Sequence, residues 1–311
     1  MARPHPAMTT IVINRCSRFI NTRVKPGFTL LLGLMMTLLV AVSLPSWAER
    51  PAHIAAPSWT SQLENDITRH VALEERKAFT TDEDESFSAL YLPYMSAEKR
   101  GIAILIPDWQ HSPMDNNGFS YLRQALTDDG FDTYAVVVPE INWQADIATQ
   151  SEEQAQNAQD SAVHFITEAV LDDYKKRLFA RFSKIYESLA MSQSEQLVVI
   201  AQGTSAGVLA EYLARMPSLR VNALVTVSAM LPNSNRNKHL PATLSLVGPA
   251  LLDLYYSADT PLITDSMHER NRWARRNAKY DYRQRELFGL PYEARQHVRL
   301  RKEVDGFLRQ L

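Results

Sequence analysis

The chain has 311 residues, of which 45% are hydrophobic and 22% charged. It is long enough to bury a substantial core, and it carries too few charges to be a disordered polyelectrolyte. The 33 basic and 35 acidic residues leave a formal net charge of −2, which gives no excess positive charge for a phosphate backbone and argues against a nucleic-acid partner. Cys16 is the single cysteine, which excludes a disulfide framework and a CxxC-type metal or redox site.

Residues 1–48 have the three parts of a secretory signal peptide. Five basic residues and no acidic residue occur there, an apolar run covers 28–44, and the small residues Ser46 and Ala48 stand at the −3 and −1 positions. We expect cleavage after Ala48 and no stable membrane anchor afterwards. The alternative is a retained anchor, for which 17 residues is the short limit. Met1 and Met8 remain alternative start residues.

Cleavage after Ala48 changes the composition of the chain. The mature chain has no cysteine, and its 28 basic and 35 acidic residues give a balance of −7. A cysteine-free chain suits an oxidising compartment, where a spare thiol is a liability. We therefore expect a periplasmic or secreted protein, with an N-terminal extension at 49–84 and one folded domain at 85–311. The sequence identifies no protein partner.

Helices and strands are expected to alternate along the mature chain. A capping-box pattern at Ser61 predicts a helix to about Phe79. Apolar runs and helical spacing then predict strands at 87–94, 102–106, 133–138, 197–201, 223–227, 251–256 and 282–288, and helices at 119–126, 171–189, 208–215, 267–279 and 292–311. Residues 144–161 are polar and Gln-rich, which indicates a linker or surface helix. This alternation predicts an α/β fold with one doubly wound, mostly parallel sheet.

The strongest motif is a G-x-S-x-G sequence at 203–207, between an apolar strand and a helix. Such a turn projects a serine hydroxyl from the edge of a sheet, and small neighbours such as Gly203 and Gly207 keep its backbone free of clashes. In this register Ser205 is the candidate nucleophile.

Two other registers of this turn remain open. The apolar strand runs directly into Ala201, which places Gly203 at the nucleophile position and makes the turn non-catalytic. A helix that starts at Ala206 instead places Thr204 there.

The chain resembles the α/β-hydrolase superfamily and, more closely, an exported bacterial family of unknown function within it (DUF3530-like). The stretches that carry the resemblance are 101–111, 122–126, 129–131, 138–139, 202–206 and 304–308. The resemblance implies the sheet of an α/β hydrolase. It also implies a serine hydrolase that acts on an ester-type bond of a small-molecule or acyl substrate. The alternative is a non-catalytic pseudo-hydrolase that serves as a periplasmic binding or envelope-associated protein.

The resemblance suggests partners for the serine. Asp259 follows the strand at 251–256 and is the candidate acid, with Asp253 inside that strand as the alternative; Asp259 could also simply initiate a turn. His297 is the candidate base, because a helix after a parallel strand begins at the edge where active sites collect. His297 comes later in the sequence than the usual histidine of the superfamily. The alternative interpretation is that His297 packs against the core and has no catalytic role.

An oxyanion hole would use the backbone N–H of Ala206, in the Ser205 register, and that of Trp109, in the loop after the strand at 102–106. Asp108 in the same loop would add negative charge where the transition state develops it, which argues against ordinary ester hydrolysis. Trp109 and His111 could instead shape the mouth of a pocket. The eight histidines are scattered and no HExxH occurs, so we expect no metal and no cofactor.

Overall fold

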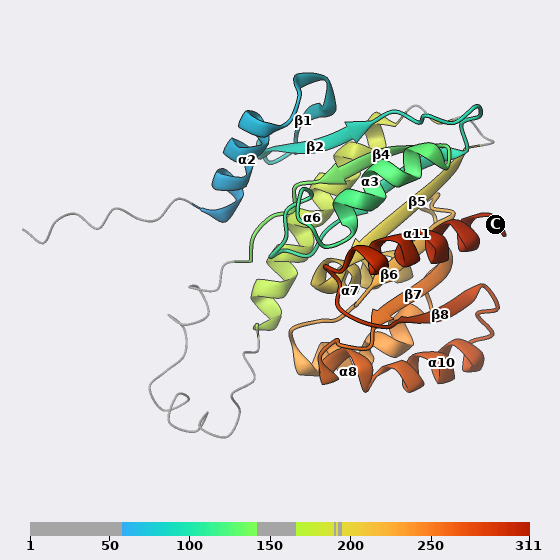
Figure 1. The fold of residues 1–311 in the computed structure, drawn as a ribbon. Helices are drawn as coiled ribbons and strands as arrows, with labels where there is room; N and C mark the ends of the chain where they lie inside the picture. The colour runs from blue at the N-terminus through green and yellow to red at the C-terminus, as the bar shows by residue number, and fades with distance from the viewer. Residues whose placement is uncertain (1–57, 142–165, 190, 192–194) are drawn as a thin grey trace, which may run out of the picture. The chain divides into compact units, whose positions relative to one another are not determined.

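The computed structural model describes residues 58–141, 166–189, 191 and 195–311, all of which belong to one compact unit that begins at Pro57 (Figure 1). The expected signal peptide at 1–48 and the Gln-rich segment at 144–161 lie outside the described residues. Across the described ranges, no helix combines the length and the apolar character needed to cross a membrane.

An eight-stranded sheet runs through this unit (Figure 1), in the order β1-β2-β4-β3-β5-β6-β7-β8. β2 pairs antiparallel with β1 and β4, and every other neighbouring pair is parallel. The strands are β1 (Arg76–Thr80), β2 (Ser86–Leu92), β3 (Gly101–Ile106), β4 (Phe131–Val136), β5 (Gln196–Gln202), β6 (Ala223–Val227), β7 (Ala250–Tyr256) and β8 (Tyr282–Leu287). The prediction of a doubly wound, mostly parallel sheet is confirmed.

Helices cover both faces of the sheet (Figure 1). The alternating side chains of β5 show why: Val199 packs into one core with α6 and α7, and Ile200 packs into a second core with α3 and α11. A strand that is buried on both faces has apolar residues throughout. The longer helices are α2 (Trp59–His70), α3 (Phe119–Asp128), α6 (Glu168–Ser188), α7 (Gly203–Arg215), α8 (Ser234–Leu244), α10 (Met267–Arg276) and α11 (Ala294–Leu308).

The first helix is shorter than the sequence predicts. The structure ends α2 at His70, and the residues up to Thr80 form a short 3₁₀ turn and then β1. In β1 the ring of Phe79 stacks on Phe87 of β2, with 5.4 Å between the centroids. This contact between neighbouring strands outweighs the local helical pattern, and the sheet therefore begins before residue 85.

Two further helices differ from expectation. α8 was not predicted, because it is polar and contains Pro241; the side chain of Asn233 caps it by accepting a hydrogen bond from the backbone N–H of Arg236 at 3.1 Å. α7 begins at Gly203, directly after β5, whereas the sequence placed a turn over 203–207 before the helix. The strand therefore runs straight into the helix at Gly203.

The sheet brings five segments to one edge. The carboxyl ends of parallel strands meet at the same edge of a sheet, where α/β proteins build their sites. Asp108 follows β3, Gly203 follows β5, Ser228 follows β6, Asp259 follows β7, and the loop at 288–293 follows β8. Any site of the hydrolase type must be assembled from these segments.

Candidate functional site

The turn between β5 and α7 has Gly203 at its apex. Gly203 has a φ of +56°, a left-handed conformation in which a side chain is disfavoured. A strained residue at the junction of strand and helix is the position that carries the nucleophile in an α/β hydrolase. Of the three registers that the sequence leaves open, the backbone matches the one with Gly203 at the apex of the turn.

The carboxylate of Asp108 fills the space above Gly203. A Cβ atom built on Gly203 would lie 2.5 Å from both Cγ and Oδ2 of Asp108. Oδ1 of Asp108 accepts hydrogen bonds from the backbone N–H groups of Thr204 and Trp109, each at 2.9 Å. A side chain from the β3 loop thus stands where a side chain of the elbow would otherwise be.

The two donors to Asp108 are the groups that would form an oxyanion hole. In this fold the hole uses the N–H of the residue after the nucleophile and an N–H from the loop after β3. With Gly203 at the apex, these groups belong to Thr204 and Trp109. Of the two donors expected from the sequence, Trp109 lies beside Asp108, whereas Ala206 lies two residues beyond Thr204 in α7 and is buried in the core.

Opposing effects act on the Asp108 carboxyl. Its pKa is raised above the ordinary value of 3.8, mainly because burial removes water from the charged form. The hydrogen bonds from Trp109 and Thr204 and the nearby His111 act in the other direction and are the smaller influences. The site thus holds a partly dehydrated acid at its centre.

Ser205 does not face an open site. Its side chain is fully buried, and its hydroxyl donates to the carbonyl of Pro107 at 2.6 Å. Tyr174 OH lies 2.7 Å from the same oxygen and must be the donor of that bond, since the serine proton is already directed to a carbonyl. The hydroxyl therefore ties α7 to the β3 loop and to α6, and this geometry does not support the nucleophile role predicted for Ser205.

The other residues of the motif are equally enclosed. Thr204 is fully buried, and within the described part of the chain its hydroxyl has no hydrogen-bond partner. A Cβ atom on Gly207 would collide with the carbonyl oxygen of Met230 and the side chain of Leu231. Gly207 thus allows α7 to pack closely against the segment that follows β6.

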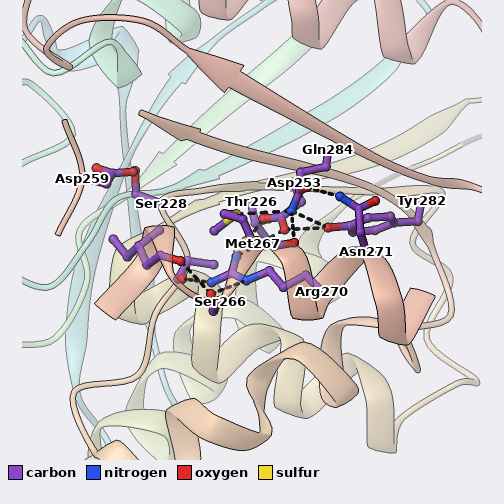
Figure 2. Close-up of polar contacts among 12 residues, drawn as sticks. Thr226, Ser228, Asp253, Asp259, Ser266, Met267, Arg270, Asn271, Tyr282 and Gln284 are labelled. Atoms are coloured by element: carbon purple, nitrogen blue, oxygen red, sulfur yellow. Dashed lines mark hydrogen bonds and ion pairs between the residues drawn. The ribbon is translucent and has the colours of Figure 1, made fainter. Parts of the chain in front are cut away.

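Asp259, the candidate acid, follows β7 and is engaged locally. Its Oδ2 accepts from the hydroxyl of Ser228 at 2.6 Å and from the backbone N–H of Tyr256 at 2.8 Å, and the former pair is visible in Figure 2. Burial raises the pKa of the Asp259 carboxyl. These contacts tie the β6 and β7 loops together and match the turn-forming interpretation of Asp259.

His297 lies in the first turn of α11 and points into the protein. It is 6% exposed, and its Nε2 lies 2.9 Å from the carbonyl oxygen of Pro291. Because a carbonyl only accepts, Nε2 carries the proton and donates it there. The partners of Ser205, Asp259 and His297 are thus different groups, so the structure does not bring the three together as a triad.

Asp253, the alternative acid, belongs to a buried ion pair that the sequence did not reveal (Figure 2). Its carboxylate meets the guanidinium of Arg270 at 3.0 Å, and both side chains are fully buried. Thr226 and Tyr282 donate to the carboxylate at 2.8 and 3.0 Å, and Arg270 donates to the carbonyl of Ala229 at 2.6 Å. These bonds fix α10 against the sheet. An aspartate inside an apolar strand was the available sequence signal.

One cavity of about 470 Å³ lies between α6, α7 and α8, away from Gly203. Its charged lining is largely self-paired, since Glu211 binds both Lys175 and Arg236. Among the residues that the structure describes, no group of three or more His, Cys, Asp or Glu side chains could hold a metal ion.

Solved structures of α/β hydrolases are similar to this chain. A dienelactone hydrolase from Anabaena variabilis has a TM-score of 0.51 and 13% identity and covers 76% of this chain and 98% of its own. Est1E from Butyrivibrio proteoclasticus has a TM-score of 0.53 at 9% identity, with coverages of 75% and 98%. A lidless α/β serine hydrolase from Xanthomonas campestris has a TM-score of 0.50 at 16% identity, with coverages of 76% and 94%. At these identities the similarity establishes the α/β-hydrolase fold alone.

Sequence comparison points to one family. No curated protein matches the chain. The family described as "Protein of unknown function (DUF3530)" matches residues 33–310, which is most of the chain. The predicted resemblance is therefore confirmed, and the chain belongs to the DUF3530 family.

Proposed function

We propose that this protein is a non-catalytic pseudo-hydrolase that acts by binding and keeps the α/β-hydrolase fold without its chemistry. One observation carries the proposal: the carboxylate of Asp108 accepts from the N–H groups of Thr204 and Trp109 directly above Gly203. Acyl transfer requires a nucleophile at the apex of the elbow and free donors for the oxyanion. Here the apex is a glycine, and both donors are already used by the protein.

Movement of Asp108 away from the elbow would not supply the missing nucleophile. The hydroxyl of Ser205 lies within the first turn of α7 and is held between Pro107 and Tyr174. A substrate oxyanion near Thr204 would also develop its charge beside the Asp108 carboxylate, and like charges repel strongly in a partly dehydrated site. Both features favour a binding function over a serine hydrolase.

Ester turnover tests this proposal. Purified protein should hydrolyse short-chain and medium-chain p-nitrophenyl esters no faster than the Ser205→Ala variant does, and neither should exceed the rate in buffer. The two proteins come through the same purification, so a contaminating esterase would appear equally in both. A wild-type rate that the Ser205→Ala change abolishes would overturn the proposal.

The proposal includes export to the periplasm, as an envelope-associated or binding protein. The support is the acid-free basic segment, apolar run and small residues of 1–48, together with the absence of cysteine after Ala48. The mass and N-terminal sequence of protein from the periplasmic fraction should give a chain that begins at Glu49. An intact N-terminus in that fraction, or protein confined to the cytosol, would contradict it.

A further inference from the structure

The loop that joins β8 to α11 exposes three large apolar side chains within five residues. Phe288 is 58% exposed, Leu290 37% and Tyr292 61%. Gly289, with a φ of +110°, and Pro291 separate them. Exposed apolar residues that occur singly need no explanation, but a group of three on one loop points to a contact.

Hydrogen bonds to neighbouring elements hold this loop in place. The buried His297 donates from Nε2 to the carbonyl of Pro291 at 2.9 Å, and the N–H of Gly289 donates to the hydroxyl of Ser257 at 3.1 Å. The guanidinium of Arg299 lies 5.3 Å from the centre of the Phe288 ring. These hydrogen bonds fix the loop that carries the apolar side chains, and the Phe288 ring packs against the guanidinium of Arg299 in α11.

A row of residues on α11 continues the exposed surface. Val298 and Arg299 each lie three or four positions from both Arg295 and Lys302, so the four residues share one side of the helix. The side that faces the core carries His297, Leu300, Val304 and Phe307. The α11 patch is defined as Phe288, Leu290, Tyr292, Arg295, Val298, Arg299 and Lys302. Figure 1 shows α11 in red at the end of the chain, after the edge strand β8.

The charge of the patch is only partly neutralised. Arg295 lies 3.6 Å from Glu293, and the adjacent Arg285 lies 3.6 Å from Glu303. Within the described ranges, no acidic side chain lies within ion-pair distance of Arg299 or Lys302. Residues 267–311 contain 12 basic and six acidic residues, although the whole chain has a net charge of −2. This C-terminal segment therefore carries a formal charge of +6, and Arg295, Arg299 and Lys302 are the basic residues that it contributes to the patch.

We propose that the α11 patch docks the protein onto an anionic phospholipid bilayer. Arg295, Arg299 and Lys302 would meet lipid phosphates, while Phe288 and Tyr292 enter the region between head groups. A bilayer offers phosphate and apolar material in one plane, which matches cations placed beside protruding apolar side chains. The centre of a protein–protein interface is instead depleted in charged residues, lysine above all, whereas Arg295, Arg299 and Lys302 stand beside the apolar side chains of this patch.

Hydrogen exchange followed by mass spectrometry tests the proposal on the full chain. The protein is mixed with excess vesicles of phosphatidylcholine, either alone or containing phosphatidylglycerol, and the peptides that cover 285–302 are compared. This readout is local, so a contribution of the N-terminal segment to vesicle binding does not obscure it. We expect slower exchange in these peptides with phosphatidylglycerol than with phosphatidylcholine alone. Equal exchange in the two kinds of vesicle would overturn the proposal.

Matched variants separate the patch from general effects of charge and exposure. The Phe288→Ser/Tyr292→Ser and Arg299→Gln/Lys302→Gln variants should lose the protection, and the latter should weaken vesicle affinity roughly thirtyfold. Tyr280 lies just before the first residue of β8, and its side chain is 94% exposed. The Tyr280→Ser variant should retain the protection. Arg275→Gln/Arg276→Gln on α10 should also retain it. Equal loss in these control variants would overturn the proposal. Protection that grows with protein concentration in the absence of lipid would also overturn it and assign the patch to self-association.

Discussion

The carboxyl carbon of Asp108 lies 2.5 Å from the point at which a Cβ atom on Gly203 would stand. The two residues are far apart in the sequence but share one space at the edge of the sheet. Any side chain at 203 would require Asp108 to move, and the left-handed backbone at 203 already disfavours one. This relationship gives a steric reason for a glycine at the apex of the elbow, and the proposed binding function rests on it.

Gly203→Ala should destabilise the protein by about 1–3 kcal/mol, through the clash with Asp108 and the positive φ. In an Asp108→Gly background the same change should cost less, because only the backbone term remains. Urea unfolding of the wild type, both single variants and the double variant measures the coupling. Gly248→Ala is the control, since a Cβ atom there has no neighbour within 4 Å. Strict additivity of the two changes would contradict the shared space.

The burial of Asp108 predicts a specific dependence of stability on pH. Its pKa is raised above 3.8 by burial, so the folded state binds the proton more tightly than the unfolded state does. The stabilisation from this group is complete below about pH 4 and is lost as the pH rises through the folded-state pKa. The unfolding free energy of the wild type should therefore fall relative to that of Asp108→Asn as the pH rises from about 4 through the folded-state pKa.

Chemical denaturation of the two proteins at several pH values checks this expectation. Asp128→Asn, at a carboxylate whose side chain is 62% exposed, controls for the loss of one negative charge. If the Asp108→Asn and wild-type curves run parallel, then the carboxyl is not the dehydrated group that the geometry describes.

Ser205→Ala should lower the free energy of unfolding by about 1–3 kcal/mol, because the buried carbonyl of Pro107 and the hydroxyl of Tyr174 each lose a partner. Tyr174→Phe should cost less, since Ser205 keeps its bond to Pro107. Thermal or urea unfolding ranks the two variants. A Ser205→Ala protein as stable as the wild type would argue that the hydroxyl is not bound in this way.

Arg270→Met should be strongly destabilising, by about 3–5 kcal/mol, because it leaves the Asp253 carboxylate buried without its cation. Arg272→Gln, which removes an exposed pair with Glu269 on the same helix, should cost less than about 1 kcal/mol. Unfolding in urea measures both. Similar losses for the two variants would mean that the buried pair does not fix α10 against the sheet.

The sheet could be predicted well because its central strands are apolar on both faces. The run at 197–201 shows this, since neighbouring residues serve two different cores. β1 was not predicted because it forms through pairing with β2. The local helical pattern that begins at Ser61 carries no information about that pairing. α8 was missed because a polar helix that contains Pro241 has no apolar periodicity to reveal it.

The site was less predictable because it depends on backbone register and on a contact between distant segments. The motif at 203–207 satisfies the G-x-S-x-G pattern, but only the φ of Gly203 shows which residue occupies the apex. The bond from Thr204 to Asp108 joins segments 96 residues apart. Two sequence features indicated the glycine register. The apolar strand continues directly into Ala201, and the acidic Asp108 follows the strand at 102–106.

Reaction of the purified protein with a fluorophosphonate, followed by intact mass measurement, tests the central claim most directly. No covalent adduct should form on the wild type or on Ser205→Ala, since the one serine of the elbow is buried and its hydroxyl donates to the carbonyl of Pro107. A single adduct that forms on the wild type and disappears with Ser205→Ala would contradict the account and restore a serine hydrolase.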